Sequence, residues 1–279
     1  MPDVIAERIS RYVLDGSDDD LRRLLRISEF LAEPTRAAIT RTGIRPGWSA
    51  IECGCGPLGA LGILADLVGP EGRVVGIDFH EATVARCRSV LDMLGVGYGD
   101  VMVADVHGLD PKEAGAPFDL AYCRCFLMHQ ANPAETLSAV SRLVRPGGWI
   151  VVQEPLRFPP PVSHPRVPAQ ERYWELMYLA MEASGIPSYS VETLPGSAET
   201  AGLEVVHIGG FNRPALDAAS SLELHLLTLV ASRARIVGSG VASETEVEAL
   251  LAEMRAAMAE DLQWSASPFF LDLVMRTGT

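Results

Sequence analysis

Residues 50–59 have the sequence Ala50-Ile51-Glu52-Cys53-Gly54-Cys55-Gly56-Pro57-Leu58-Gly59, in which an apolar run with one acid opens into a glycine-rich turn. Glycine permits the sharp backbone turn that joins a strand to a helix, and it lets a ligand approach the main chain closely. The helix after such a turn presents free N–H groups to a ligand. The stretch therefore predicts the first strand–turn–helix unit of an α/β fold.

Three acids lie where three successive predicted strands end. They are Glu52, Asp78 in Val74-Val75-Gly76-Ile77-Asp78, and Asp105 in Val101-Met102-Val103-Ala104-Asp105. Their spacing corresponds to one strand–helix–strand repeat. Strands of a parallel sheet end on the same side, so we expect the acids and the glycine turn to share one crevice. Acids in such a crevice suit the hydroxyl and amine groups of a nucleoside-type cofactor.

The rest of the chain continues the alternation. A doubly wound α/β fold follows, with a mostly parallel, Rossmann-like sheet of seven strands and a helical cap. Strands are predicted at 48–53, 73–78, 100–105, 118–123, 149–153, 203–208 and 269–275, and helices at 58–68, 81–94, 133–145, 169–184, 196–201, 218–235 and 244–262.

Changes in this pattern divide the chain into four segments. Residues 1–47 form an N-terminal helical cap segment, and residues 48–154 form the cofactor-binding core. A proline-rich start introduces a helical insertion at 155–195, which we expect to act as a lid over an acceptor. Residues 196–279 complete the sheet and add further cap helices.

Composition excludes several classes of partner. The net charge of −13 is spread along the chain without a basic cluster, which argues against nucleic acid. No apolar run approaches the roughly 18 residues of a membrane span, and the N-terminus lacks signal-peptide features. Five cysteines, an odd number, suit reduced thiols and a cytoplasmic location. A homodimer is left open.

The glycine turn satisfies G-x-G-x-x-G at Gly54, Gly56 and Gly59. This pattern alone fits both a dinucleotide site and a methyl-donor site. An acid 19 residues after Gly59, Asp78, supports the first reading. The second is favoured because Glu52 precedes the turn, where it could help hold a cationic amino-acid group, and because Asp105 follows a third strand. A nicotinamide-dependent oxidoreductase remains the less favoured alternative.

Residues 48–154 resemble class I S-adenosylmethionine-dependent methyltransferases, particularly bacterial enzymes that act on small molecules. The resemblance covers the acidic-x-Gly-x-Gly loop, Gly76-Ile77-Asp78, Ala104-Asp105-Val106, the run from Phe118 to Arg124, and Leu143-Val144-Arg145-Pro146-Gly147-Gly148-Trp149. It departs from the family at Leu58, where the third loop glycine is usually found; here Gly59 follows one place later. This departure concerns the local shape of the loop rather than the identity of the cofactor.

The resemblance implies S-adenosylmethionine as the cofactor, S-adenosylhomocysteine as its product, and specific contacts for each part of the donor. Asp78 would bind the ribose hydroxyls, and Phe79 would pack beside the adenine. Asp105 would accept a hydrogen bond from the adenine amine, and the Val106 N–H would assist in binding the adenine. The methionine end would be held by Glu52, by the loop backbone at Gly54, Cys55, Gly56 and Gly59, and by the backbone at Cys123 and Arg124.

Two residues are candidates for a general base. His129 follows the fourth predicted strand and should face the methyl end of the donor, where a histidine acts as a base or only lines the pocket. Glu154 ends the fifth strand and could orient an acceptor, hold a metal or cap the next loop. His207 and His225 are interpreted as structural.

An apolar acceptor wall is predicted from Trp174, Met177 and Tyr178 in the inserted helix, with Phe211 as a weaker member. Such stripes are more often core. The pairs Cys53/Cys55 and Cys123/Cys125 lack a usual zinc spacing, so no metal is expected. The predicted function is methyl transfer by in-line displacement to a small, hydrophobic, secondary-metabolite-like acceptor. A protein that binds S-adenosylmethionine without methyl transfer, such as a cyclase, is the alternative.

Overall fold

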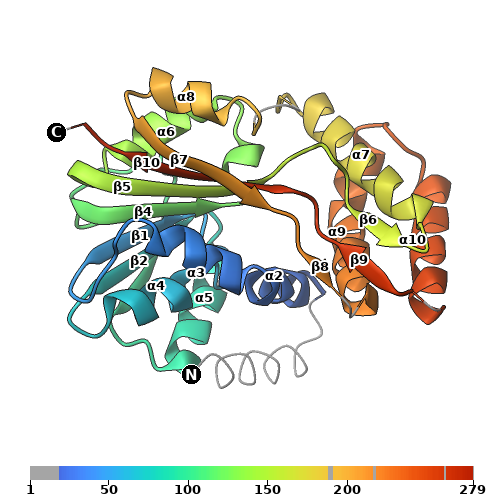
Figure 1. Cartoon of the computed structure of the whole chain (residues 1–279), viewed down its shortest axis with the longest axis horizontal. Coiled ribbons are helices and arrows are strands. Elements are labelled where there is room, and N and C mark those ends of the chain that lie inside the picture. Colours follow the sequence, from blue (N-terminus) through green and yellow to red (C-terminus); the bar gives the residue numbers. More distant parts are fainter. Residues whose placement is uncertain (1–18, 188–190, 216–217, 261, 279) are drawn as a thin grey trace.

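A seven-stranded sheet with the order β3-β2-β1-β4-β5-β10-β7 forms the centre of the protein (Figure 1). The computed structural model describes residues 19–187, 191–215, 218–260 and 262–278. The first five strands are parallel, and β10 is antiparallel to both β5 and β7. The strands are β1 (Ser49–Cys53), β2 (Arg73–Asp78), β3 (Gly99–Val103), β4 (Phe118–Arg124), β5 (Val144–Pro155), β7 (Glu204–Phe211) and β10 (Phe270–Arg276).

Helices cover both faces of this sheet. On one face lie α3 (Ala32–Thr40), α4 (Leu61–Val68) and α5 (Glu81–Leu94), and on the other lie α6 (Pro133–Ser141) and α8 (Leu194–Thr200) (Figure 1). The central strands are apolar because both of their faces are covered. Ile51, Ile77 and Val151 are buried in this way. The predicted doubly wound, mostly parallel fold is confirmed.

A second sheet of three short strands was not predicted. It consists of β6 (Val162–His164), β9 (Trp264–Ala266) and β8 (Pro214–Ala215), with β9 antiparallel to both neighbours. Each short strand is close in sequence to one strand of the large sheet: β6 follows β5, β8 follows β7, and β9 precedes β10. The order β6-β9-β8 therefore repeats the order β5-β10-β7, and the small sheet continues that edge of the large one.

Four helices form the cap. They are α2 (Asp19–Phe30), α7 (Pro168–Ala183), α9 (Ala218–Gly238) and α10 (Glu244–Ala259). Helices α7, α9 and α10 gather beside the small sheet, while α2 lies near the carboxyl ends of the parallel strands (Figure 1). An ion pair of 2.7 Å joins Arg22 of α2 to Glu223 of α9. The cap thus combines segments from the beginning, middle and end of the chain.

Several predicted boundaries shift for local reasons. Helix α4 begins at Leu61 rather than 58, because the left-handed glycines extend the turn. Strand β3 ends at Val103, two residues before Asp105, and helix α6 ends at Ser141, so that β5 starts at Val144. The helical prediction for residues 1–18 lies outside the described residues.

Candidate active site

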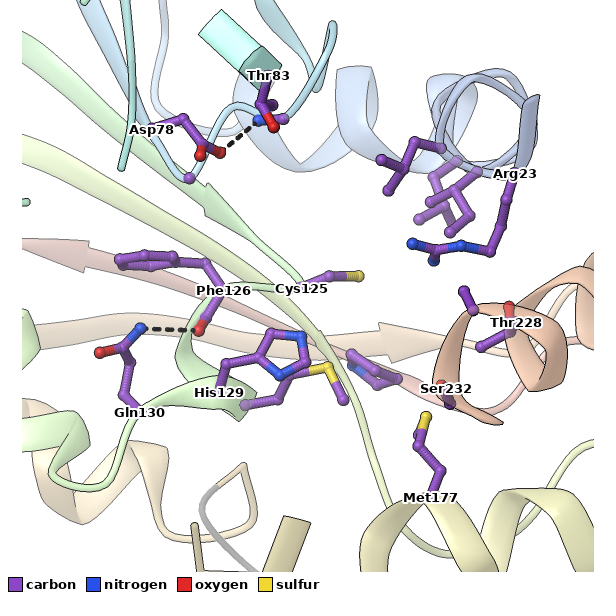
Figure 2. A pocket seen from close by; sticks show the side chains of 18 of the residues that line it. Arg23, Asp78, Thr83, Cys125, Phe126, His129, Gln130, Met177, Thr228 and Ser232 are labelled. Carbon is purple, nitrogen blue, oxygen red and sulfur yellow. Dashed lines mark hydrogen bonds between the residues drawn. The ribbon is translucent and has the colours of Figure 1, made fainter. Parts of the chain in front are cut away.

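A cavity of about 1090 Å³ lies between the carboxyl ends of the parallel strands and the cap (Figure 2). Ligand pockets usually measure roughly 300–1000 Å³, so there is room for two small molecules. The lining residues after β1, β2 and β3 are called the sheet edge: Gly54, Gly56, Asp78, Phe79, His80, Thr83, Ala104, Asp105, Val106 and His107. Those of α2, α7 and α9 are called the cap wall: Arg23, Leu24, Ile27, Phe30, Tyr173, Trp174, Met177, Ser221, Leu224, His225, Thr228, Ala231, Ser232 and Arg235.

The glycine turn brings bare backbone to the sheet edge. The N–H groups of Gly54 and Cys55 donate to the carbonyl oxygen of Ile77 at 2.9 and 3.0 Å. Gly54 has a φ of +73° and Gly56 one of +57°, values that side chains rarely adopt. A Cβ on Gly54 would lie 2.5 Å from the ring of Phe126. The Cys55 side chain is buried in the core and does not line the cavity.

The departure at Leu58 has a packing reason. Leu58 is buried with Leu25 of α2 and Val90 of α5, so it joins the turn to two helices. Gly59 has a φ of +52°, and an added Cβ would overlap the Glu52 carboxylate and the Cys55 carbonyl oxygen. Gly59 is therefore needed to let the chain pass over Glu52, and it does not itself line the cavity.

Glu52 supports the turn from below. Its side chain is 1% exposed, and its two carboxylate oxygens accept the Ala60 N–H at 2.9 and 2.8 Å. Burial raises the pKa of Glu52 to about 8, although the Arg124 guanidinium and the Ala60 N–H act in the opposite direction. Glu52 is absent from the cavity lining. Glu52 therefore contacts the turn itself, and its expected contact with the methionine end of a donor stays a prediction.

Asp78 and Asp105 both reach the cavity and also bind local backbone. Asp78 accepts the Gly56 N–H at 3.1 Å through one oxygen and the His80 N–H at 3.0 Å through the other. Asp105 accepts the His107 N–H at 3.0 Å. A carboxylate has about four acceptor sites, so each acid retains capacity for a ligand. The two side chains lie at the sheet edge as the spacing predicted.

Apolar side chains flank these acids. Phe79 follows Asp78 and is 67% exposed at the cavity, where its ring is the largest exposed apolar surface of the sheet edge. Val106 follows Asp105 and is buried in the cavity wall. A flat ligand held by the two acids would cover Phe79, and this would remove apolar surface from water.

The segment after β4 reaches the cavity two residues later than predicted. Cys123 is fully buried, and Arg124 turns its guanidinium toward the cap, donating to Thr35 at 3.0 Å and to Ser28 at 3.1 Å. Neither Cys123 nor Arg124 lines the cavity; Cys125 and Phe126 do. The predicted backbone contact of a donor at Cys123 and Arg124 stays a prediction, and Arg124 anchors α2 and α3 to the sheet.

Glu154 positions the segment that carries His129. This segment is the short 3-10 helix η1 (Leu127–His129). The fully buried Glu154 carboxylate accepts the N–H groups of Phe126 at 2.9 Å, Leu127 at 2.8 Å and Met128 at 3.3 Å. Burial raises the pKa of Glu154 to about 7, although the three hydrogen bonds act in the opposite direction and lower it. Glu154 does not line the cavity, and in this structure it holds η1 in place; its assignment as a base or acceptor ligand stays a prediction.

His129 does line the cavity, on the side opposite Asp78 (Figure 2). Burial lowers its pKa to about 4, and the positive charges of Arg235 and Arg23 lower it further in the same direction. The ring is therefore neutral at neutral pH. A lowered pKa reduces the basicity of the ring, and the roles of His129 as a base and as a wall residue both stay predictions.

Two of the four residues predicted to form an acceptor wall reach the cavity. Trp174 and Met177 of α7 line the cavity. Tyr178 is turned away, with its hydroxyl donating to the Pro155 carbonyl at 3.0 Å. Phe211 is stacked on Phe270 with ring centroids 5.2 Å apart, and only Phe270 reaches the cavity. Tyr178 and Phe211 are thus supports of the wall rather than members of it.

One face of α9 lines the cavity along most of its length, and this was missed. Its polar members Ser221, His225, Thr228, Ser232 and Arg235 recur at steps of three or four residues. Residues at that spacing share one side of a helix. The signal was present in the sequence as a polar stripe on an otherwise apolar helix, but it resembled an ordinary solvated face.

His225 belongs to a buried polar group behind this face. The Gln170 amide nitrogen lies 2.7 Å from Nδ1 of His225 and donates to the Ser265 hydroxyl at 3.1 Å. Burial lowers the pKa of His225 to about 3, so its ring is neutral. His225 is both a satisfied buried histidine, as predicted, and a cavity residue. The group ties α7, α9 and β9 together.

The cysteines are placed within the core. Cys53 and Cys123 lie opposite each other on β1 and β4, and both are buried. Among the described residues, no cluster of three or more His, Cys, Asp or Glu side chains could hold a metal ion. None of the helices in the described ranges has the length and apolarity to cross a membrane.

Comparison with known proteins identifies the family. A family model for a methyltransferase domain matches residues 44–188, just over half of the chain. An uncharacterized 37.1 kDa protein of a Streptomyces fradiae transposon is 42% identical over 40% of this chain and 31% of its own length. A ubiquinone biosynthesis O-methyltransferase of Paracidovorax citrulli is 36% identical over 39% of this chain and 44% of its own length. The match thus spans less than half of each of these relatives.

Solved structures share the fold over most of the chain. The mycolic acid cyclopropane synthase CmaA1, complexed with SAH, has a TM-score of 0.55 at 14% identity and covers 91% of this chain and 85% of its own. The cyclase SpnF has a TM-score of 0.54 at 19% identity, with coverages of 88% and 81%. With the sheet order, the glycine turn and the paired acids, these findings show that the chain belongs to the class I S-adenosylmethionine-dependent methyltransferases.

Proposed function

We propose that this protein binds S-adenosylmethionine at the sheet edge and transfers its methyl group to a small, largely apolar acceptor held by the cap wall. The observation that carries the proposal is that one cavity is shared by two groups of residues. The acids Asp78 and Asp105 line one side of it, and Trp174 and Met177 line the other. A methyl transferase needs such a space, because donor and acceptor must meet within it.

The sheet edge fits the donor. Asp78 retains acceptor capacity for a ribose diol, and such charge-assisted bonds are stronger than neutral ones. The exposed ring of Phe79 offers a surface for adenine, and Asp105 offers an acceptor for its amine. Gly54 and Gly56 leave room for the methionine end, because neither presents a side chain. Glu52 and Glu154 hold the turn and η1 in place.

When bound, S-adenosylmethionine supplies a methyl group that is already activated by the sulfonium charge. The protein then has to align an acceptor atom with that group and exclude water. The η1 segment, with His129 as its last residue, lies on one side of the cavity, and α9 lies on another (Figure 2).

A second candidate is binding of the same cofactor without methyl transfer, as in a cyclase. It is favoured by the weak basicity of His129 and by the enclosure of Glu154, which leave a neutral hydroxyl acceptor without an evident base. The fold likeness to a cyclase is compatible with it. Product mass separates the two, since methyl transfer adds one methylene unit and cyclisation adds none.

Calorimetric titration with S-adenosylmethionine, S-adenosylhomocysteine and NAD tests the cofactor. A panel of small acceptors, assayed for S-adenosylhomocysteine release and product mass, tests the reaction. We expect binding of both sulfur compounds and no binding of NAD. Binding of NAD alone would favour an oxidoreductase and overturn the proposal.

A further inference from the structure

The cap wall combines apolar side chains with hydrogen-bond donors and two cations. Its apolar members include Ile27, Trp174 and Met177. Its charged members are Arg23 of α2 and Arg235 of α9, and no Asp or Glu occurs among the cap-wall residues that the structure describes. The chain as a whole carries a net charge of −13. A cap wall with two cations and no carboxylate, in an acidic protein, therefore suits a ligand with a negative group.

The two arginines act on the same part of the cavity. Arg23 extends from α2 into the space that His129 faces, with Thr228 and Ser232 of α9 opposite (Figure 2). Arg23, Arg235 and His129 line the same cavity, and the positive charge of each arginine lowers the pKa of His129. A ligand beside His129 would therefore lie in the field of two positive charges.

Neighbouring arginines on the same helices have a different role. Arg22 pairs with Glu223 at 2.7 Å, and Arg233 pairs with Glu244 and, at 2.5 Å, with Glu248. These pairs join α2 to α9 and α9 to α10 outside the cavity lining. Arg23 and Arg235 lie on the lining faces of their helices instead. Each of the two helices thus has an arginine that pairs with a neighbouring helix and another that lines the cavity.

We propose that the cap wall binds an apolar molecule bearing a carboxylate, whose oxygens are held by Arg23 and Arg235 beside His129. Guanidinium groups match carboxylates in geometry and bind them through charge-assisted bonds. The apolar body of the ligand would pack against Trp174 and Met177. This inference rests on the proposed methyltransferase function and names the chemical class of its acceptor.

An ionised acceptor also removes the need for a base. A lone pair of the carboxylate oxygen forms the new bond to the methyl carbon, while the electron pair of the carbon–sulfur bond returns to sulfur. The negative oxygen and the positive sulfonium are both neutralised, and no proton moves. The methyl ester and S-adenosylhomocysteine result. The ester has lost the charge that the two arginines hold, which favours its release.

The test is calorimetric binding of matched ligand pairs to protein saturated with S-adenosylhomocysteine. Decanoate is compared with decanamide, and cinnamate with cinnamamide, at pH 7.5. We expect at least one carboxylate to bind about tenfold to a hundredfold more tightly than its amide. Arg23→Gln and Arg235→Gln should each reduce that preference at least fivefold, while the lysine variants retain part of it.

Arg255→Gln is the matched control, because Arg255 is an exposed cap arginine on α10 outside the cavity lining. It should leave the preference unchanged. Carboxylates and amides that bind equally, or carboxylates that fail to bind to protein that still holds S-adenosylhomocysteine, would overturn the inference and leave the proposed function intact. If the wild-type protein does not bind S-adenosylhomocysteine, the proposed function itself is refuted. Mass analysis of products formed with S-adenosylmethionine should show the base-labile methyl ester.

Discussion

Both carboxylate oxygens of Glu52 accept one N–H group, that of Ala60, at 2.9 and 2.8 Å. The acid that signalled a ligand site in the sequence is thus bound to the protein's own backbone. Its place beneath the glycine turn means that Glu52 sets the shape of the turn, which in turn exposes Gly54 and Gly56 to the cavity. Substitution of a residue that only supports the turn should therefore differ in its effect from substitution of a residue that meets a ligand.

Glu52→Gln should flatten the pH dependence of stability. Burial raises the pKa of Glu52 from 4.5 to about 8, so the folded protein keeps a proton that the unfolded chain loses. Stability is then lost as pH rises from about 4.5 to about 8. Glutamine cannot ionise, so the variant should gain stability relative to the wild type as pH rises. Urea unfolding at pH 5.5 and pH 8 measures this, with the exposed Glu199→Gln as control. Parallel pH profiles for wild type and variant would contradict it.

Asp78→Ala should weaken S-adenosylmethionine binding by about 1.5–3 kcal/mol, because it removes a charged acceptor. It also removes bonds to the N–H groups of Gly56 and His80. Asp110→Ala is the control, since Asp110 accepts the N–H two residues later, that of Lys112, at 2.9 Å but lies outside the cavity lining. Calorimetry should show weaker binding for the first variant only. Equal affinities would remove Asp78 from the cofactor site.

Glu154→Ala should lower both stability and S-adenosylhomocysteine affinity. It deprives the N–H groups of Phe126, Leu127 and Met128 of their acceptor, at a cost of about 1–3 kcal/mol for each group left unsatisfied. Glu154→Gln keeps an acceptor oxygen and should retain most of the affinity. Thermal unfolding and calorimetry measure the two effects. If both variants are stable, bind normally and still lose transfer, Glu154 is a base after all.

Arg235→Gln should raise the pKa of His129. Burial lowers that pKa to about 4, and the charge of Arg235 adds to the effect by disfavouring the imidazolium. Removing the positive charge should therefore move the titration upward, toward the ordinary value. Titration of the His129 ring followed by NMR provides the measurement, with Arg255→Gln as the variant that should leave it in place. An unchanged midpoint would show that Arg235 does not act on this side of the cavity.

The sequence predicted the large sheet and the sheet edge because both depend on short-range pattern. Apolar runs that end in Glu52, Asp78 and Asp105 mark strands of a parallel sheet, and the topology brings their ends together. Asp78 and Asp105 reach the cavity as predicted. Pattern could not show that Glu52 would point under the turn, because its direction depends on Gly59 and Ala60 as neighbours in space.

The cap was less predictable because its contacts are distant in sequence. Strands β6, β8 and β9 have two or three residues each, too few to carry an alternating pattern, and their partners lie far along the chain. The roles of Arg23 and Arg235 depend on the way α2 and α9 face each other. Trp174 could be assigned to the cavity from its helix, whereas Tyr178, one turn later, lies behind the wall.

The small sheet determines how the cap could be exchanged. Its three strands come from the segments next to β5, β7 and β10, so the cap is connected to the main sheet at three points along the chain. The cap is therefore not a single insertion at one position in the sequence. Transplanting residues 155–195 alone would move β6 and α7 but leave behind β9, the strand with which β6 pairs. A chimera with a relative would have to carry all three segments together, so acceptor choice in this protein is easier to alter by single side chains than by grafting.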